Sequence, residues 1–100
     1  MNQKLETANG IRYLDFSERF TFADSSEFRR TLMDYIALRP QVIVFNLGRL
    51  VQMDSAGLGM LLVAQKNCQD AGIQLQLTGV AGEVKHILEV TQCYDRFQII

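Results

Sequence analysis

The stretch Val51-Gln52-Met53-Asp54-Ser55-Ala56-Gly57-Leu58-Gly59-Met60-Leu61-Leu62 decides the fold, because it leads from a strand signal into a helical one. The apolar, β-branched run Val42-Ile43-Val44-Phe45 lies before it, and an apolar helical pattern continues after it. This context places Ser55 at the exposed start of a helix. Unpaired backbone N–H groups and the positive end of the helix dipole favour negative charge there. The position therefore suits a serine that carries a phosphate.

Upstream of this stretch, the sequence predicts a hairpin followed by a helix. Residues 4–8 and 11–16 are two extended segments on either side of Asn9-Gly10, a strong signal for a hairpin turn. Asp24-Ser25-Ser26-Glu27 then has the form of a capping box. The helix is expected over residues 25–38 because Pro40 pushes the preceding residue out of the α region. Its apolar stripe consists of Phe28, Leu32, Tyr35 and Ile36.

The rest of the chain alternates between strands and helices. A strand over residues 41–47, apolar on both sides, is typical of a central position in a covered sheet. A helix over residues 56–71 follows, with Gly72 as its C-cap and an inner stripe formed by Leu58, Leu61, Leu62, Gln65 and Cys68. A strand is expected over 73–77, a helix over 83–90 and a strand over 97–100. The predicted order is β-β-α-β-α-β-α-β. It defines an α/β fold with a mixed, mostly parallel sheet and helices packed on it.

Length and composition restrict the class of protein. One hundred residues form one domain, expected over residues 1–100, and 48% hydrophobic residues are ordinary for a soluble protein. A net charge of −1 gives no electrostatic reason to expect a nucleic acid partner. The start has no signal peptide pattern, and no apolar run has the length of a membrane span, so we expect a cytoplasmic protein. Cys68 and Cys93 are interpreted as buried free thiols.

The sequence resembles the anti-sigma-factor antagonist branch of the STAS domain family. The resemblance rests on Val42-Ile43-Val44-Phe45-Asn46-Leu47 and Met53-Asp54-Ser55-Ala56-Gly57-Leu58-Gly59. Leu75-Gln76-Leu77-Thr78-Gly79 and Val84-Lys85-His86-Ile87-Leu88 fit the same order of elements. The resemblance extends over nearly the whole chain and implies a single STAS-like domain.

The resemblance also implies a mode of regulation. In this family the serine after the aspartate is phosphorylated by an ATP-dependent serine kinase that also sequesters a sigma factor or another target. Carried over by position, that serine is Ser55, preceded by Asp54. The unphosphorylated protein binds the kinase and frees its other client, and a PP2C-type phosphatase resets the system. No cofactor of the chain itself is implied.

The surface around Ser55 is the expected partner interface. It comprises Met53, Asp54, Ala56, Gly57 and Leu58, with core packing as the alternative for Leu58 and the small residues. One departure from the family pattern concerns the acidic residue that many members have after the first hairpin. Phe20 falls near that position here, and Asp24 is the carboxylate that could take part of its place.

Three other interpretations compete with a regulatory serine. Asp54 and Ser55 are also the residues of a plain N-cap turn. A constitutive STAS subunit of a transporter or signalling scaffold would need no phosphorylation. A hydrolase would need His86, the single histidine, as a base for Ser55, and no Gly-x-Ser-x-Gly elbow is present. We therefore expect no catalytic residues, and the absence of ligand spacing predicts no metal site.

Overall fold

The computed structural model describes residues 2–4 and 10–100, and its strands form one sheet in the order β1-β2-β3-β4-β5. The strands are β1 (Asn2–Lys4), β2 (Ile11–Phe20), β3 (Val42–Met53), β4 (Gln74–Thr78) and β5 (Gln98–Ile99). β1 is antiparallel to β2, and each of the other neighbouring pairs is parallel. The mixed, mostly parallel sheet confirms the predicted fold class.

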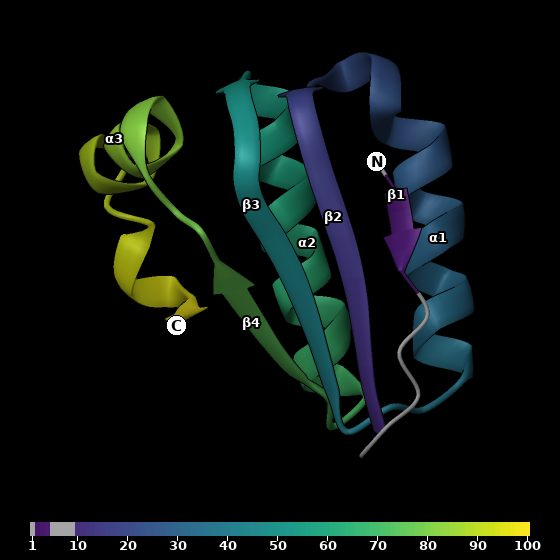
Figure 1. Ribbon diagram of the computed structural model, residues 1–100. Helices are drawn as coiled ribbons and strands as arrows, with labels where there is room; N and C mark the ends of the chain where they lie inside the picture. The colour runs from purple at the N-terminus through teal and green to yellow at the C-terminus, as the bar shows by residue number, and fades with distance from the viewer. Residues whose placement is uncertain (1, 5–9) are drawn as a thin grey trace.

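Two helices cover one face of this sheet. α1 (Ser25–Ala37) and α2 (Ser55–Asp70) contact each other and lie behind the strands in Figure 1. α3 (Gly82–Val90) contacts β3 and lies beside its carboxyl end. Two short 3-10 helices, η2 (Phe22–Asp24) and η3 (Tyr94–Arg96), were not expected from the sequence. Otherwise the order of elements is the predicted one.

The opening hairpin is confirmed as an antiparallel pair, with different strand bounds. Lys4 lies opposite Tyr13 and Asn2 opposite Asp15, so the first strand lies earlier than residues 4–8. Residues 5–9, including Asn9 of the expected turn, lie outside the described residues. Gly10 has a φ of +70°, a backbone conformation that glycine adopts readily.

The capping box predicted over Asp24-Ser25-Ser26-Glu27 is wrong, and a capping box is found instead between Thr21 and Asp24. Asp24 is in the N-cap position of α1, yet its side chain makes no capping bond to that helix. Its carboxylate instead accepts a hydrogen bond of 2.9 Å from the backbone N–H of Thr21. The Thr21 hydroxyl accepts one of 3.3 Å from the N–H of Ala23, which completes the box around η2. The Asp24 carboxylate, which was predicted to cap α1, therefore caps η2.

β3 is longer than the predicted strand, which ended at Leu47. It continues to Met53 because β2 pairs with it, in parallel, as far as Phe20. The pairing shifts register between Asp15 and Ser17 and again between Glu18 and Arg19. Such bulges change the direction of a strand pair without ending it. The pairing of β2 with β3 therefore continues beyond Gly48.

The end of α2 follows the predicted signal closely. Gly72 has a φ of +73° and its N–H donates to the carbonyl of Gln69. The N–H of Ile73 donates to the carbonyl of Cys68 at 2.8 Å. Together these two bonds form a Schellman motif, in which a glycine ends the helix and turns the chain into the next strand.

An aromatic cluster forms the core between the sheet and α1. Phe20 lies 4.8 Å from Phe16 and 5.0 Å from Phe28, measured between ring centroids. Phe45 on the central strand lies 5.1 Å from Phe16 and 5.8 Å from Phe28. All four rings are buried. Edge-to-face and tilted pairs at these separations add stability beyond the area they bury.

Cys68 and Cys93 are free and buried, as predicted. Burial raises the pKa of the Cys68 thiol to about 11. Within the part of the chain that the structure describes, no helix combines the length and hydropathy needed to cross a membrane.

We expect Phe20→Ala to lower the free energy of unfolding by about 3–5 kcal/mol, because it removes a fully buried ring that packs against Phe16 and Phe28. Phe22→Ala is the matched control. Its ring is 72% exposed, so its effect should stay within about 0.5 kcal/mol. Urea denaturation measures both values. Equal losses in the two variants would contradict the assignment of Phe20 to the core.

We expect the Cys68 thiol to resist modification in the folded protein. At pH 8 its reaction with a thiol reagent should be roughly 100-fold slower than in the unfolded chain, since the raised pKa keeps the thiol protonated. Folding favours the protonated form, so this contribution to stability is complete below pH ~8.5 and is lost as the pH rises towards 11. The rate of thiol modification, measured in a Cys93→Ser background, tests the first effect. Urea midpoints of the wild type and of Cys68→Ala, compared across this pH range, test the second. Rapid modification of Cys68 in the folded protein would contradict the prediction.

Candidate functional site

The candidate site lies where the carboxyl ends of two parallel strands meet. Phe20 at the end of β2 pairs with Met53 at the end of β3. η2 and α1 follow the first of these strands, and α2 follows the second. In open α/β sheets this edge is the usual place for ligands and partners, because loops and helix starts converge there. The Asp54-Ser55 turn is therefore located where a binding site is expected.

Asp54 links the two segments that leave the strands. Its Oδ1 accepts a hydrogen bond of 2.7 Å from the N–H of Gly57, which makes it the N-cap of α2. Its Oδ2 accepts one of 3.2 Å from the N–H of Phe22 in η2. A charged acceptor strengthens both bonds. The carboxylate thus satisfies two backbone donors, one in its own helix and one 32 residues earlier in the chain.

Ser55 is the first residue of α2, and its side chain is exposed. The Asp54 side chain accepts a hydrogen bond from the N–H of Gly57, and its backbone carbonyl accepts one from the N–H of Leu58. Among the described residues, no hydrogen bond engages the Ser55 hydroxyl or the N–H groups of Ser55 and Ala56. A hydroxyl in this position is accessible to a modifying enzyme, and the two N–H groups lie near any charge placed on it.

Three of the residues expected around Ser55 belong to the core. Met53 is 3% exposed and Leu58 is 9% exposed. Gly57 is buried, and a Cβ there would collide with the carbonyl oxygen of Phe20 and with the side chain of Met53. Tight packing of α2 on the sheet, the alternative raised from the sequence, explains this glycine. The exposed surface at the turn is left to Asp54, Ser55 and the partly exposed Ala56.

The two residues discussed for the family's acidic position both have roles in the fold. Phe20 is fully buried, so the aromatic cluster accounts for its presence at the end of β2. Asp24 is partly exposed, and its carboxylate holds the Thr21 backbone. The carboxylate adjacent to the serine in the chain is that of Asp54.

The sequence interpretation missed several exposed apolar residues beside the turn. Phe22, Met33 and Val63 are 72%, 54% and 57% exposed. They line a hollow between α1 and α2 together with Ala56 and the partly buried Met60. Met33 and Val63 lie outside the apolar stripes of their helices, and that departure is the signal that could have identified them.

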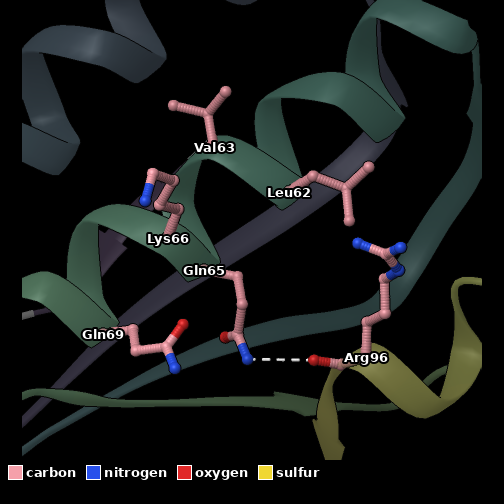
Figure 2. A pocket seen from close by; sticks show the side chains of 6 residues that line it. All are labelled: Leu62, Val63, Gln65, Lys66, Gln69 and Arg96. Carbon is pink, nitrogen blue, oxygen red and sulfur yellow. Dashed lines mark hydrogen bonds between the residues drawn. The ribbon is translucent and has the colours of Figure 1, made fainter.

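A second hollow lies on the opposite flank of α2. Figure 2 shows Gln65 reaching across it, where its Nε2 donates a hydrogen bond of 2.9 Å to the carbonyl of Arg96. This bond attaches η3 to α2. His86 is exposed on α3. No group of three or more His, Cys, Asp or Glu side chains within residues 2–4 and 10–100 could hold a metal ion.

Comparison with known sequences identifies the family. The sequence profile of the STAS domain matches residues 2–100. A STAS-domain-containing protein of Pseudomonas aeruginosa is 30% identical over 81 residues, which cover 81% of this chain and 79% of that protein. The chain belongs to the STAS domain family, which confirms the resemblance seen in its sequence.

Solved structures of a sulfate transporter family protein and of an anti-sigma factor antagonist have the same fold. A sulfate transporter family protein from Wolinella succinogenes gives a TM-score of 0.81 at 21% identity, covering 96% of this chain and 80% of that one. The anti-sigma factor antagonist SpoIIAA, in its unphosphorylated form, gives 0.77 at 14% identity, covering 99% and 86%. SpoIIAA is from Bacillus, and its phosphorylated form is also similar. At these identities the likeness shows the fold alone.

We expect Asp54→Ala to lower the free energy of unfolding by about 0.5–2 kcal/mol, because the N–H groups of Gly57 and Phe22 lose their acceptor. Asp54→Asn should retain most of the stability, since an amide oxygen also caps a helix. Asp34→Ala, at an exposed position on α1, is the control. Thermal unfolding measures the change, and amide hydrogen exchange at Phe22 should accelerate in Asp54→Ala. An unchanged exchange rate would contradict the link between η2 and α2.

Proposed function

We propose that this chain is an anti-sigma-factor antagonist that switches partners under the control of phosphorylation at Ser55. In its unphosphorylated form it binds a serine kinase that has an ATP-binding fold and also acts as the anti-sigma factor. Phosphorylation of Ser55 ends that binding, and a PP2C-type phosphatase restores it. The chain itself is a regulatory binding protein and not an enzyme.

The observation that carries this proposal is the difference between two neighbouring side chains. The Asp54 carboxylate is held by the N–H groups of Gly57 and Phe22, whereas the Ser55 hydroxyl is exposed and contributes to no hydrogen bond of the described residues. The fold therefore uses Asp54 as its cap and leaves Ser55 without a structural task. The turn can accept a modification at Ser55 without losing its cap.

Simple energetics explain why phosphorylation would act on binding and spare the fold. A phosphate adds about −1.5 to −2 charges. At the start of a helix such a charge stabilises by roughly 0.3–1 kcal/mol. In a packed interface beside Asp54 the same charge would be desolvated and unpaired, which costs several kcal/mol. A loss of about 2.7 kcal/mol already weakens binding 100-fold.

A constitutive STAS subunit of a transporter or signalling scaffold is the alternative function. The similarity to the Wolinella succinogenes protein, described as a sulfate transporter family protein, supports it. Such a subunit would bind its partner whether or not Ser55 carried a charge. A serine hydrolase has less support, because the single histidine, His86, is exposed on α3.

We expect the partner kinase and ATP to add one phosphate to the chain, at Ser55. Ser55→Ala should abolish the modification and keep kinase binding, whereas Ser55→Asp should weaken binding about 100-fold. Intact mass measurement and titration calorimetry give the two results. Ser26→Ala, at an exposed serine near the start of α1, should still be phosphorylated.

A second control separates the charge from its position. Gln69 lies about 21 Å along α2 from Ser55, at roughly 1.5 Å per residue, so Gln69→Asp should leave binding unchanged. Phosphate at a residue other than Ser55 would refute the proposed switch. Wild-type behaviour of both Ser55→Ala and Ser55→Asp would favour the constitutive subunit.

A further inference from the structure

The hollow between α1 and α2 is lined mainly by apolar residues. We call it the α1–α2 groove, and it has a volume of about 520 Å³. The buried side chains of Phe28 and Leu32 contribute to it from the core side. Phe22, Met33 and Val63 line it and are each more than half exposed. Exposed apolar side chains gathered in one concavity are typical of an interaction site.

The charged lining of the groove is positive only. Arg29 is the only charged residue that lines it, and no hydrogen bond or ion pair within the described residues engages its guanidinium. Glu27 and Asp34 belong to the same helix, but helical spacing places them on its other flank. α2 carries no acidic residue before Asp70. An apolar groove with one unpaired guanidinium is complementary to an apolar surface that carries a carboxylate.

Gly59 supplies an independent observation. Glycine destabilises the interior of a helix relative to alanine, so a structural reason is expected for it. For Gly57 that reason is the Phe20 carbonyl, but a Cβ at Gly59 would meet nothing within 4 Å. The φ of Gly59 is also not positive. The missing side chain therefore benefits nothing in this chain, and it lets another backbone approach α2 closely.

We propose that the α1–α2 groove binds one amphipathic helix of a protein partner. The apolar face of that helix covers Met33 and Val63, its backbone passes Gly59, and one of its carboxylates pairs with Arg29. A helix can approach two others in this way when a small residue lies at the contact. The groove begins at Ala56, next to Ser55, so the partner that recognises Ser55 also occupies the groove. That last step rests on the proposed function, whereas the chemistry of the groove does not.

The groove can be tested with a designed probe. The probe is a helical peptide with leucines at i, i+4 and i+7 flanked by glutamates, and its twin carries lysines instead of glutamates. Titrated into the ¹⁵N-labelled protein, the acidic peptide should shift the amides of Arg29, Met33, Gly59 and Val63. It should bind at least tenfold more tightly than the basic twin. Equal affinities, or shifts centred elsewhere, would overturn the proposal.

Substitutions separate binding from folding. Gly59→Leu places a side chain in the groove at a position where a Cβ meets nothing within 4 Å, and leucine favours a helix more than glycine does, so the melting temperature should not fall while peptide affinity drops at least tenfold. Met33→Ser should weaken binding and Leu38→Ser should not, although the two side chains are 54% and 55% exposed. Arg29→Glu should weaken binding, and Arg30→Glu, on the neighbouring exposed residue, should not. Retained affinity in Gly59→Leu would refute the groove as the binding site.

Two further outcomes identify the occupant. With the kinase that phosphorylates Ser55, Gly59→Leu should weaken binding at least tenfold; wild-type affinity would overturn the proposal even if Ser55 phosphorylation holds. If no kinase modifies Ser55, the proposed function fails, and the peptide titration still decides the groove. Sedimentation of the free chain should show a monomer. A dimer that Gly59→Leu dissociates would assign the groove to a second copy and overturn the partner helix.

Discussion

The close approach of Gly57 to the Phe20 carbonyl fixes the relative position of the two segments that form the site. It brings the start of α2 against the end of β2, and only a residue without a Cβ allows that distance. Asp54 then spans both segments through the N–H groups of Gly57 and Phe22. These contacts hold the turn from both sides, and the side chain of Ser55 is exposed beside them.

The same constraint explains the departure at Phe20. The side chain of Phe20 at the end of β2 is fully buried and packs against the rings of Phe16 and Phe28 in the layer between the sheet and α1. An ionised carboxylate in that environment would be desolvated without a partner, at a cost of several kcal/mol. The aromatic ring instead contributes to the core. The acidic character of the site is then provided by Asp54, which its two backbone donors hold in place.

The surface that extends from the turn between α1 and α2 is lined mainly by apolar residues. The N–H of Phe22 donates a hydrogen bond to Asp54 in the turn, and its exposed side chain lines the α1–α2 groove. Ala56 follows Ser55 and lines the same groove. The serine and the groove are therefore parts of one continuous surface, with a polar end at the strand edge and an apolar end between the helices. In the proposed function one partner contacts both parts, and a charge at Ser55 would then weaken its binding to the whole surface.

Local signals in the sequence were sufficient to predict the order of the main helices and strands, although not η2, η3 or the full length of β3. Helical spacing gave α1 and α2, Gly72 gave the end of α2, and the Asp54-Ser55 pair gave the helix start. Which residues near Ser55 are accessible depends on tertiary packing. The linear pattern favoured the core for Leu58 and left Met53 open between core and contact, and packing places both in the core. The Phe22–Asp54 bond, the extension of β3 and the exposure of Met33 and Val63 depend on residues distant in sequence, because long-range pairing of β2 with β3 and of α1 with α2 creates them.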